Sequence, residues 1–328
     1  MNETTLTLIK PDAITKGLVG VVLNSINGQG LEIQETTRIQ LNQMDLEALY
    51  SDLLQEPDLY SKLAEFLTSA PVIIMKVSGE DAIHRTKYRA IGKYHSLAGL
   101  RNTYSESLIK NVAHASDSPE SAARELQHFE PCFQKEKKMN QERFKNITVF
   151  ALAGMSECGK STVGKYLDSK EVPRLKIGAI FEAVKNRESP AQDLIDFISE
   201  QEQKNPLALW DSFIDELIGE MQILSAKNVS IESLYGGGLG TYLKQKLGKS
   251  FCLVFIDIPL EIRLKRQMIR EGLDNIKEAK KILLPRDQFK IDTGTHKLKE
   301  IADEVIDNSG TIEQLYEQID NLVSGYCK

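Results

Sequence analysis

The sequence predicts an α+β domain followed by an α/β domain with a parallel sheet flanked by helices. In the first half, short apolar runs at 5–11 and 70–79 lie on either side of an amphipathic stretch at 44–55. In the second half, long stretches with helical character separate four apolar runs, at 146–154, 228–234, 251–259 and 303–308. This alternation is typical of parallel strands joined by crossover helices.

A chain of 328 residues is longer than a typical single domain. The stretch 134–146 is highly charged and almost free of apolar residues, which suits a domain boundary formed by either a solvated helix or a flexible linker. We therefore expect domains at 1–133 and 147–328. A final helix is indicated by apolar residues at helical spacing, Ile312, Leu315, Ile319 and Leu322.

The composition is that of a globular protein, with 41% hydrophobic and 27% charged residues. A formal net charge of −6 argues against a protein built to bind nucleic acid or anionic membranes, because that affinity depends on clustered Lys and Arg. No apolar run approaches the roughly 18 residues that a membrane span needs. The four cysteines lack the spacing of a zinc site or disulfide framework, and no secretory signal stands at the N-terminus. We expect a cytoplasmic protein.

The segment "GMSECGKST" at 154–162 fits the pattern G-x-x-x-x-G-K-[ST] and directly follows a predicted strand. Gly154 and Gly159 let the backbone curl so that its N–H groups converge on phosphate oxygens at a helix N-terminus. Lys160 is expected to neutralise charge on the transferred phosphoryl group, and the Ser161 hydroxyl to ligate Mg²⁺. The candidate ATP-binding residues of this loop are Gly154, Ser156, Gly159, Lys160, Ser161 and Thr162.

A kinase with such a loop also needs basic residues that cover the transferred phosphoryl group and exclude water. Candidates on the stretch 257–272 are Arg263, Arg266 and Arg270, and the stretch 284–290 adds Arg286 and Lys290. A solvated basic helix face is the alternative interpretation of each of these residues.

Taken together, the segments "FIDIPLEIRLKRQMIREG" and "LKEIADEVIDNSGTIEQLYEQI" resemble the C-terminal half of small-molecule P-loop kinases. The nearest resemblance is to dephospho-coenzyme A kinases and nucleoside monophosphate kinases, and it covers about 147–325. It implies the α/β P-loop kinase fold and leaves the acceptor substrate open.

Acidic residues at the ends of predicted strands are candidates for completing this site, because a carboxylate there can hold the metal's water shell or accept a proton. We prefer Glu232 to Asp257 as the catalytic carboxylate, since Asp257 comes shortly before a proline and suits a helix cap. Glu182, at the end of 175–182, contacts the acceptor's base or sugar in one interpretation and lies in a buried turn in the other.

The segment "NVAHASDSPE" places His114 among small and polar residues rather than on an apolar stripe. Together with "TLIKPDAITKGLVGVVLNSI" at 7–26 and with Arg101, it resembles the nucleoside diphosphate kinase family over about 4–130. The resemblance implies a ferredoxin-like N-terminal domain in which a histidine carries the γ-phosphate from a nucleoside triphosphate to a nucleoside diphosphate. A nucleophilic imidazole must be neutral and held in one tautomer by a hydrogen-bonding partner.

The resemblance implies His114 as the nucleophile and Glu125 as the residue that orients it. We expect Glu125 on a helix opened by Asp117 and Pro119, with Glu120 completing a capping box. The remaining candidates are the phosphate and sugar contacts Lys10, Arg101 and Asn111, the neighbouring Tyr50, and Asp117 as a magnesium ligand.

Other positions depart from the family pattern. Leu59 or Tyr60 stands where the family stacks a phenylalanine on the base. Tyr88 and Tyr94 replace an arginine and a threonine that contact phosphate, and Arg89 is the candidate substitute for the arginine. The loop before Arg101 is also several residues short. These departures bear on nucleotide affinity and on the family's hexameric assembly.

Two functions fit this sequence. In the first, the chain is a bifunctional kinase that uses ATP and Mg²⁺: the C-terminal domain phosphorylates a nucleoside or deoxynucleoside monophosphate, and the N-terminal domain converts the diphosphate to the triphosphate. In the alternative, a single small-molecule P-loop kinase carries a degenerate N-terminal domain that regulates or dimerises it. Either way we expect nucleotide ligands, a homo-oligomer formed through the N-terminal domain, and no membrane or specific nucleic-acid partner.

Overall fold

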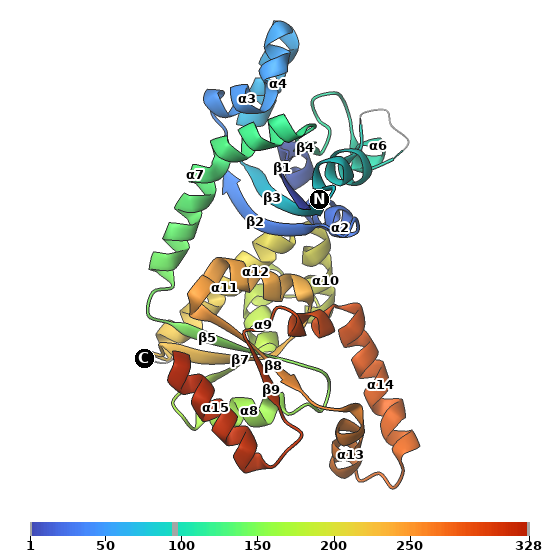
Figure 1. Cartoon of the computed structure of the whole chain (residues 1–328), viewed down its shortest axis with the longest axis vertical. Coiled ribbons are helices and arrows are strands. Elements are labelled where there is room, and N and C mark those ends of the chain that lie inside the picture. Colours follow the sequence, from blue (N-terminus) through green and yellow to red (C-terminus); the bar gives the residue numbers. More distant parts are fainter. Residues whose placement is uncertain (1, 94–97, 327–328) are drawn as a thin grey trace. The chain divides into compact units, whose positions relative to one another are not determined.

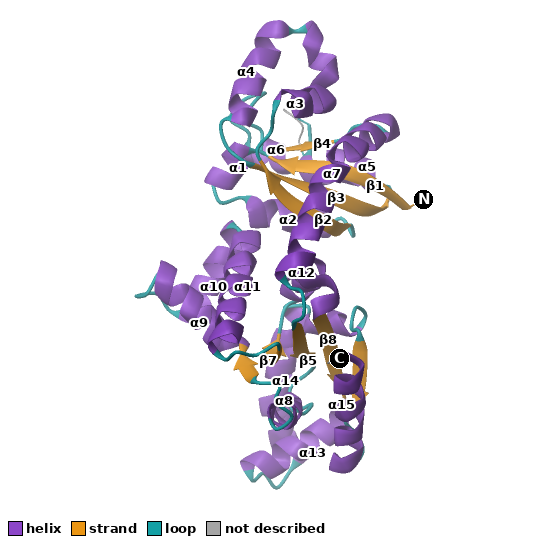
Figure 2. Cartoon of the chain, turned by 90° about the vertical axis from the view of Figure 1, so that its left-hand side faces the viewer, coloured by secondary structure: helices purple, strands orange, loops and turns teal. Residues whose placement is uncertain are grey.

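The computed structural model describes residues 2–93 and 98–326, which form two compact units (Figure 1). Unit 1 consists of Met1–Met139 and Ile195–Leu209, and unit 2 consists of Asn140–Leu194 and Trp210–Lys328. Each unit contains one sheet with its own helices (Figure 2). Tyr94 and Cys327 lie outside the described residues.

Unit 1 is built on a four-stranded antiparallel sheet with the strand order β2-β3-β1-β4. Its strands are β1 (Asn2–Ile9), β2 (Glu32–Ile39), β3 (Val72–Glu80) and β4 (Ala113–Ala115). Helices follow both β1 and β3, which gives the βαββαβ arrangement of a ferredoxin-like fold. The two apolar runs predicted as strands form β1 and β3. The polar β2 and the three-residue β4 carry too weak a pattern to be predicted.

A helical hairpin is inserted between β2 and β3. The predicted amphipathic stretch 44–55 forms α3 (Gln43–Tyr50) and then tightens into a 3₁₀ segment, η1 (Ser51–Gln55). Asn42 caps α3, because its side chain accepts hydrogen bonds from Met44 N and Asp45 N. The other helices of unit 1 are α1 (Pro11–Thr15), α2 (Val19–Asn27), α4 (Pro57–Thr68), α5 (Ala82–His84), the π-helical η2 (Arg85–Ile91), α6 (Leu100–Tyr104) and most of α7 (Pro119–Arg143), together with α10 (Leu194–Lys204).

One core cluster of unit 1 lies between one face of the sheet and helices α3, α4 and α7. Leu6 and Leu8 point to the same face of β1 because side chains alternate along a strand. Phe129 and Phe133, one helical turn apart on α7, pack into the same core. This packing holds α7 against the face of the sheet that carries Leu6 and Leu8. The short strand β4 pairs with β1 in the same sheet.

Unit 2 contains a five-stranded parallel sheet with the order β6-β7-β5-β8-β9. Its strands are β5 (Thr148–Ala153), β6 (Arg174–Lys176), β7 (Asn228–Leu234), β8 (Phe251–Asp257) and β9 (Glu304–Asp307). Residues 148–153 are all buried, which is why β5 reads as an unbroken apolar run. The predicted parallel sheet flanked by helices is therefore confirmed.

Seven longer helices cover this sheet or connect its strands. They are α8 (Lys160–Asp168), α9 (Ile177–Glu188), α11 (Pro206–Ile223, which begins in unit 1), α12 (Gly237–Leu247), α13 (Leu260–Glu271), α14 (Ile276–Asp292) and α15 (Ile312–Tyr326). Short 3₁₀ segments, η3 (Gly248–Ser250) and η4 (Thr295–Lys299), precede β8 and β9. The predicted final helix forms α15, where Leu315, Ile319 and Leu322 are buried and Ile312 is exposed.

The charged stretch 134–146 is helical for most of its length. Residues 134–143 are the last turns of α7, and β5 begins at Thr148. Of the two forms that the sequence left open, the structure shows the solvated helix. Within 2–93 and 98–326, no helix combines the length and apolar character that crossing a membrane requires.

The strands at the edges of both sheets are short or carry charged side chains. In unit 1, β4 has three residues, and β2 carries Glu32, Glu35 and Arg38. In unit 2, β6 has three residues and β9 has four.

Candidate active sites

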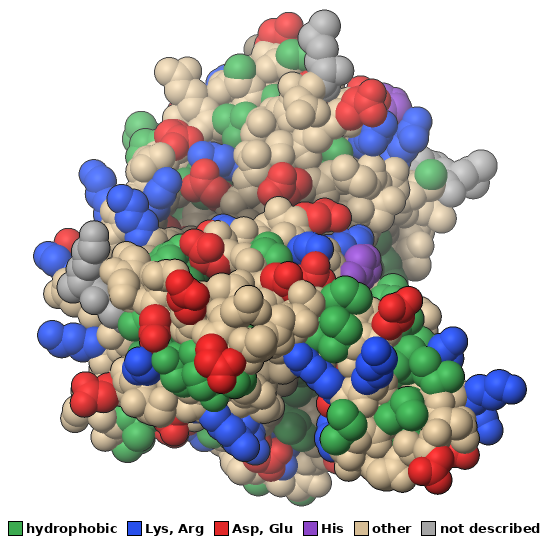
Figure 3. All heavy atoms as spheres, turned by 60° about the horizontal axis from the view of Figure 1, so that its bottom comes forward, with side chains coloured by type: hydrophobic (Ala, Val, Ile, Leu, Met, Phe, Trp, Pro, Cys, Tyr) green, Lys and Arg blue, Asp and Glu red, His purple; other side chains and the backbone are tan. Residues whose placement is uncertain are grey.

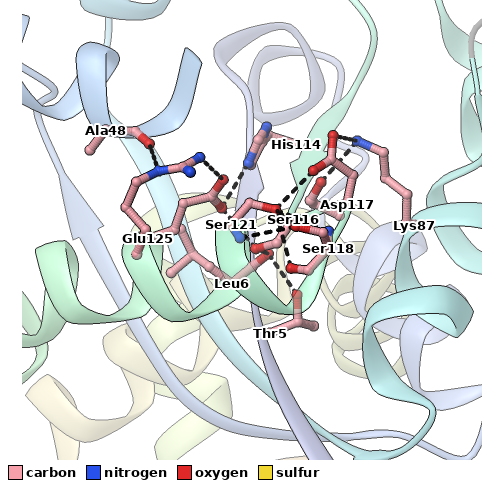
Figure 4. Close-up of polar contacts among 12 residues, drawn as sticks. Thr5, Leu6, Ala48, Lys87, His114, Ser116, Asp117, Ser118, Ser121 and Glu125 are labelled. Carbon is pink, nitrogen blue, oxygen red and sulfur yellow. Dashed lines mark hydrogen bonds and ion pairs between the residues drawn. The ribbon is translucent and has the colours of Figure 1, made fainter. Parts of the chain in front are cut away.

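The first site is built around His114, the middle residue of β4. His114 pairs with Leu8 of β1, and its Nε2 lies 3.0 Å from Glu125 Oε2 of α7 (Figure 4). Ser116 Oγ donates to the same carboxylate oxygen at 2.8 Å. His114 is 7% exposed and Glu125 only 1%, so this contact is shielded from water. The structure thus brings together the two residues that the sequence analysis paired.

The start of α7 differs from the expected cap. Ser118 Oγ accepts from Ser121 N, while Ser118 N donates to Ser121 Oγ, so these two serines form a reciprocal capping box. The prediction that Asp117 caps the helix with Glu120 is wrong, because Pro119 is the first helical residue and Ser118 precedes it. Asp117 instead accepts from Ser121 Oγ at 2.8 Å.

Three cationic side chains surround the imidazole. Lys10 Nζ donates to Asn111 Oδ1 at 2.7 Å, and Arg101 Nη2 donates to the carbonyl of Ala113 at 2.6 Å. Lys87 Nζ donates to the carbonyl of Ala115 at 3.0 Å. Arg101 and Lys87 thus bind the backbone carbonyls on either side of His114, and Lys10 binds the side chain of Asn111. Because three positive charges gather in this region, it is suited to bind a polyanion.

Burial and mutual repulsion shift the pKa values in this cluster. Burial, together with repulsion from Arg101, lowers the pKa of Lys10 to about 7. Burial also lowers the pKa of Lys87 and of Arg101, with Arg101 adding to the shift at Lys87. The pKa of His114 falls below its usual value because burial outweighs the opposing effect of Glu125. The imidazole is therefore neutral near pH 7.

The backbone just before β4 is strained. Val112 has a φ of +75°, which a β-branched residue rarely adopts. Two contacts hold it there: Val112 N donates to Asp12 Oδ2 at 3.0 Å, and Lys10 N donates to the Val112 carbonyl at 2.9 Å. The segment "KPD" at 10–12 therefore fixes the chain two residues ahead of His114.

Tyr50 contacts His114 from α3. The two rings meet edge to face, with their centroids 5.1 Å apart. The Tyr50 hydroxyl is buried without a hydrogen-bond partner among the described residues, and burial raises the pKa of Tyr50. Leu59 is half-buried on α4, whereas the hydroxyl of its neighbour Tyr60 accepts from Gln43 Nε2 at 3.0 Å.

The segment that contains Tyr88 and Arg89 brings a different cation to the strand of His114. Arg89 is exposed, and the ring of Tyr88 packs against His84 with centroids 5.0 Å apart. Lys87 lies beside Ala115 instead, and its ammonium is 4.0 Å from Asp117 Oδ2. Sequence reasoning missed Lys87, because the π-helical geometry of η2, which decides the direction of this side chain, has no sequence signature.

The second candidate site is the loop between β5 and α8. Gly154 has a φ of +136° and Gly159 a φ of +101°. A Cβ on Gly154 would lie 2.5 Å from the Ile256 carbonyl, and one on Gly159 would lie 2.2 Å from Asn308 Nδ2. Both positions therefore require glycine for conformation and for space. Ser161 is exposed and Thr162 half-buried in the first turn of α8, which begins at Lys160.

Lys160 folds back over this loop. Its Nζ donates to the carbonyls of Gly154 at 3.0 Å and Met155 at 2.9 Å. Lys290 of α14 also donates to the Gly154 carbonyl, at 3.1 Å. Burial, followed by repulsion from Lys160, lowers the pKa of Lys290 to about 7. Two amines thus converge on one carbonyl at the carboxyl end of β5.

Helices α13 and α14 hold the loop from outside. Ser156 N donates to Asp287 Oδ1 at 3.0 Å, and the other oxygen of Asp287 pairs with buried Arg263. Arg266 Nη2 donates to the Asn308 carbonyl at 2.8 Å. The sequence analysis did not single out Asp287, because nothing in the basic stretch 284–290 marks one acidic residue as buried.

The remaining basic residues lie farther out. Arg286 is exposed on α14, and Arg270 pairs with Glu157 of the loop. Figure 3 shows basic and hydrophobic side chains intermingled on the side where these helices lie. The exposed large apolar residues of α13 and α14 are Leu260, Ile269, Ile276, Leu284, Phe289 and Ile291.

The acidic candidates of unit 2 all have basic partners. Glu232 is 4% exposed, and Arg174 approaches both of its carboxylate oxygens at 2.6 Å. Asp257 pairs with Lys299 at 2.6 Å. Glu182 pairs with Lys185 at 2.8 Å on α9, so the interpretation of this stretch as a buried turn is wrong.

The described residues contain no group of three or more His, Cys, Asp or Glu side chains able to hold a metal ion. The two candidate ligands, Asp117 and Ser161, are single oxygen donors in separate units. Such a donor set suits Mg²⁺ that is coordinated mainly by the phosphates of a substrate and by water.

Comparison with known proteins gives matches to the N-terminal part of the chain. The family profile described as "Nucleoside diphosphate kinase" matches residues 3–137. The nucleoside diphosphate kinase of Sulfurimonas denitrificans is 37% identical over 130 residues, which is 39% of this chain and 94% of that protein. The Campylobacter fetus nucleoside diphosphate kinase is 36% identical over the same length and with the same coverage.

Solved structures give matches of similar extent. A crystal structure of the Aquifex aeolicus nucleoside diphosphate kinase is 31% identical, covers 41% of this chain and 95% of its own, and has a TM-score of 0.36. The apo enzyme from Encephalitozoon cuniculi is 30% identical, with 38% and 86% coverage and a TM-score of 0.36.

Proposed function

Since the chain belongs to the nucleoside diphosphate kinase family through its residues 3–137, we propose that unit 1 transfers the γ-phosphoryl group of a nucleoside triphosphate to His114 and then to a nucleoside diphosphate. The observation that carries this proposal is the contact between His114 Nε2 and the buried carboxylate of Glu125. A carboxylate accepts the Nε2 proton, so the lone pair of the neutral imidazole resides on Nδ1. Nδ1 is thus the nucleophile.

Both half-reactions use this atom. Nδ1 attacks the γ-phosphorus, and the bond from that phosphorus to the β,γ-bridging oxygen breaks as the P–N bond forms. The departing nucleoside diphosphate keeps the electron pair of the broken bond. The imidazole becomes cationic, and Glu125 stabilises that charge through Nε2–H. A β-phosphate oxygen of a second nucleoside diphosphate then attacks the phosphorus and releases neutral His114.

The cations Lys10 and Arg101 stabilise the charge on the transferred phosphoryl group, and Asn111 holds Lys10 in place. Nucleoside diphosphate kinases use ATP and Mg²⁺ for this transfer. Asp117 is the carboxylate that would contribute to holding the ion. When bound, Mg²⁺ neutralises phosphate charge.

The direct test is to incubate the purified chain with γ-labelled ATP and analyse the protein. We expect acid-labile, base-stable label on the wild-type chain and none on His114→Gln. Lys160→Ala is the matched control, because it alters the other candidate site and should label normally. Label that persists on the His114→Gln chain would disprove the assignment.

We further propose that unit 2 is an ATP-dependent kinase whose acceptor is a nucleoside or deoxynucleoside monophosphate. The connection after β5 leads to β6 on one side of the sheet, whereas the connection after β8 leads to β9 on the other. In open α/β sheets, ligands bind outside the carboxyl ends of strands at such a switch point. The loop from Gly154 to Lys160 leaves β5 at this point.

The proposed roles in unit 2 follow from this placement. Lys160 would leave the loop carbonyls and bind the phosphates, Ser161 would contact Mg²⁺, and Arg263 and Arg266 would support the loop. Glu232 would position Arg174 or, once its ion pair with Arg174 opens, would accept the proton of the acceptor substrate as a general base. The proposed functional boundaries remain 1–133 and 147–328, joined by 134–146. A homo-oligomer formed through unit 1 and a cytoplasmic location also remain predictions.

A second function is favoured by one observation: Tyr88 stands where the family has a phosphate-binding arginine, and its ring packs on His84. In this alternative, unit 1 regulates or dimerises a kinase that acts on dephospho-coenzyme A or another small acceptor. A panel of acceptors tests both. Wild type should phosphorylate a monophosphate and Lys160→Ala should not, whereas phosphorylation of dephospho-coenzyme A alone would support the alternative.

A further inference from the structure

Lys87 is a half-buried amine beside the nucleophile, and neither the sequence pattern nor the family resemblance assigns a role to it. It lies on η2, and its side chain is 14% exposed. Its Nζ donates to the carbonyl of Ala115, the residue that directly follows His114. The side chain is thus anchored on the strand that carries the nucleophile.

The charge of Lys87 is only partly balanced. The nearest carboxylate oxygen recorded for it, Asp117 Oδ2, is 4.0 Å away, beyond hydrogen-bonding distance. An anion bound next to His114 would supply a counter-charge that Lys87 lacks at hydrogen-bonding distance among the described carboxylates.

The neighbouring residues on η2 do not provide this charge. Tyr88 packs on His84, and the ammonium of Lys93 lies 5.0 Å from the centre of the Tyr88 ring. Arg89 is exposed. In the described part of this segment, Lys87 is the residue whose side chain hydrogen-bonds to the strand of His114.

We propose that Lys87 binds the phosphoryl group transferred through His114, and so replaces the arginine that Tyr88 displaced. This inference rests on the proposed function of unit 1. An ammonium has three donors. One is used on the Ala115 carbonyl, so two are available for phosphoryl oxygens. Unlike an arginine, it acts as a compact charge without bidentate geometry.

The test compares four variants of the full chain by single-turnover formation of phospho-His114 from γ-labelled ATP. Lys87→Met should lower kcat/KM by about 100-fold, the scale of losing one charge-stabilising donor. Lys87→Arg keeps a cation and should recover most of that loss. Lys93→Met removes a nearby exposed charge and should behave as wild type, and Arg89→Met tests the rival residue.

A second readout separates this inference from the proposed function. In the Lys160→Ala background, titration with a non-hydrolysable ATP analogue measures binding without chemistry. Lys87→Met should weaken binding, whereas Lys93→Met should not. If His114 takes no phosphate in wild type but Lys87→Met still weakens binding, the proposed function fails and the phosphate contact stands. Equal binding by Lys87→Met and wild type, or a larger loss in Arg89→Met, would overturn the assignment of Lys87.

Discussion

At the scale of single residues, Glu125 decides which nitrogen of His114 is free. Its carboxylate receives both His114 Nε2–H and Ser116 Oγ–H. Glu125→Gln replaces the carboxylate with a neutral amide. The amide oxygen is a weaker hydrogen-bond acceptor than the carboxylate, and the amide NH₂ group is a donor that competes for the position facing His114 Nε2–H. We expect phospho-His114 formation to slow roughly 10- to 100-fold, since a hydrogen bond to a charged group contributes about 1.5–3 kcal/mol.

Rapid-quench measurement of labelled protein would check this prediction. Glu130→Gln is the matched control, because Glu130 is a half-buried glutamate of the same helix that pairs with Lys76 rather than with His114. Equal rates for Glu125→Gln and Glu130→Gln would show that Glu125 does not orient the imidazole.

The pKa values predict a bell-shaped dependence of kcat/KM on pH. His114 must be neutral to attack, and its pKa is lowered, so the acidic limb should fall only below the usual range for histidine. Lys10 must be protonated to bind phosphate, and its pKa is about 7, so activity should decline as the pH rises above that value. Lys10→Arg stays charged and should lose the alkaline limb. An unchanged alkaline limb in Lys10→Arg would exclude Lys10 as its source.

The sequence predicted which residues form this site better than it predicted the directions in which their side chains point. His114, Asn111 and Arg101 are close in the chain, and β4 brings them to Lys10 through its pairing with β1. Lys87 was not predictable in this way. Its direction depends on a π-helical turn, and the choice between Lys87 and Arg89 depends on packing that one sequence does not encode locally.

At the scale of elements, α14 stabilises the glycine-rich loop through a buried ion pair. Asp287 accepts from Ser156 N and pairs with Arg263. Asp287→Ala leaves the guanidinium buried without its carboxylate, which costs about 3–5 kcal/mol. We expect a correspondingly lower free energy of unfolding for unit 2. Urea denaturation followed by fluorescence measures this directly, because the single tryptophan, Trp210, belongs to unit 2.

Two variants make that measurement specific. Asp292→Ala removes an exposed carboxylate from the same helix and should change little. The pair Arg263→Met with Asp287→Leu removes both charges and should recover part of the stability. A double variant less stable than Asp287→Ala would show that the ion pair is not the source of the loss.

The strands and helices of unit 2 were largely predictable, whereas their connections were not. The apolar run 251–259 predicted β8, because a strand that is buried on both faces carries apolar residues throughout and shows no alternation of apolar and polar side chains. The three-residue β6 has no such signal. Its place at the sheet edge depends on pairing with β7, a contact between residues far apart in the chain.

At the scale of the whole molecule, the proposed reactions share an intermediate, since the diphosphate made by one site is the substrate of the other. Covalent linkage raises the local concentration of a shared intermediate, to the mM range for short linkers. We expect wild type to convert monophosphate to triphosphate faster than an equimolar mixture of His114→Gln and Lys160→Ala chains. Both samples contain each working site, on one chain or on two.

The comparison is made at limiting monophosphate, with the diphosphate followed over time. Wild type should accumulate less diphosphate than the mixture. Identical time courses would show that the two sites act independently, even if both activities are present.

The charged and shortened outer strands have a consequence for the protein in concentrated solution. An unpaired strand edge offers free N–H and C=O groups to any other chain that presents a strand. Glu32, Glu35 and Arg38 along β2 would have to approach the same charges on a second molecule, and β4, β6 and β9 give too few residues for an extended ladder. Association of the chain through these strand edges into aggregated sheets is therefore disfavoured.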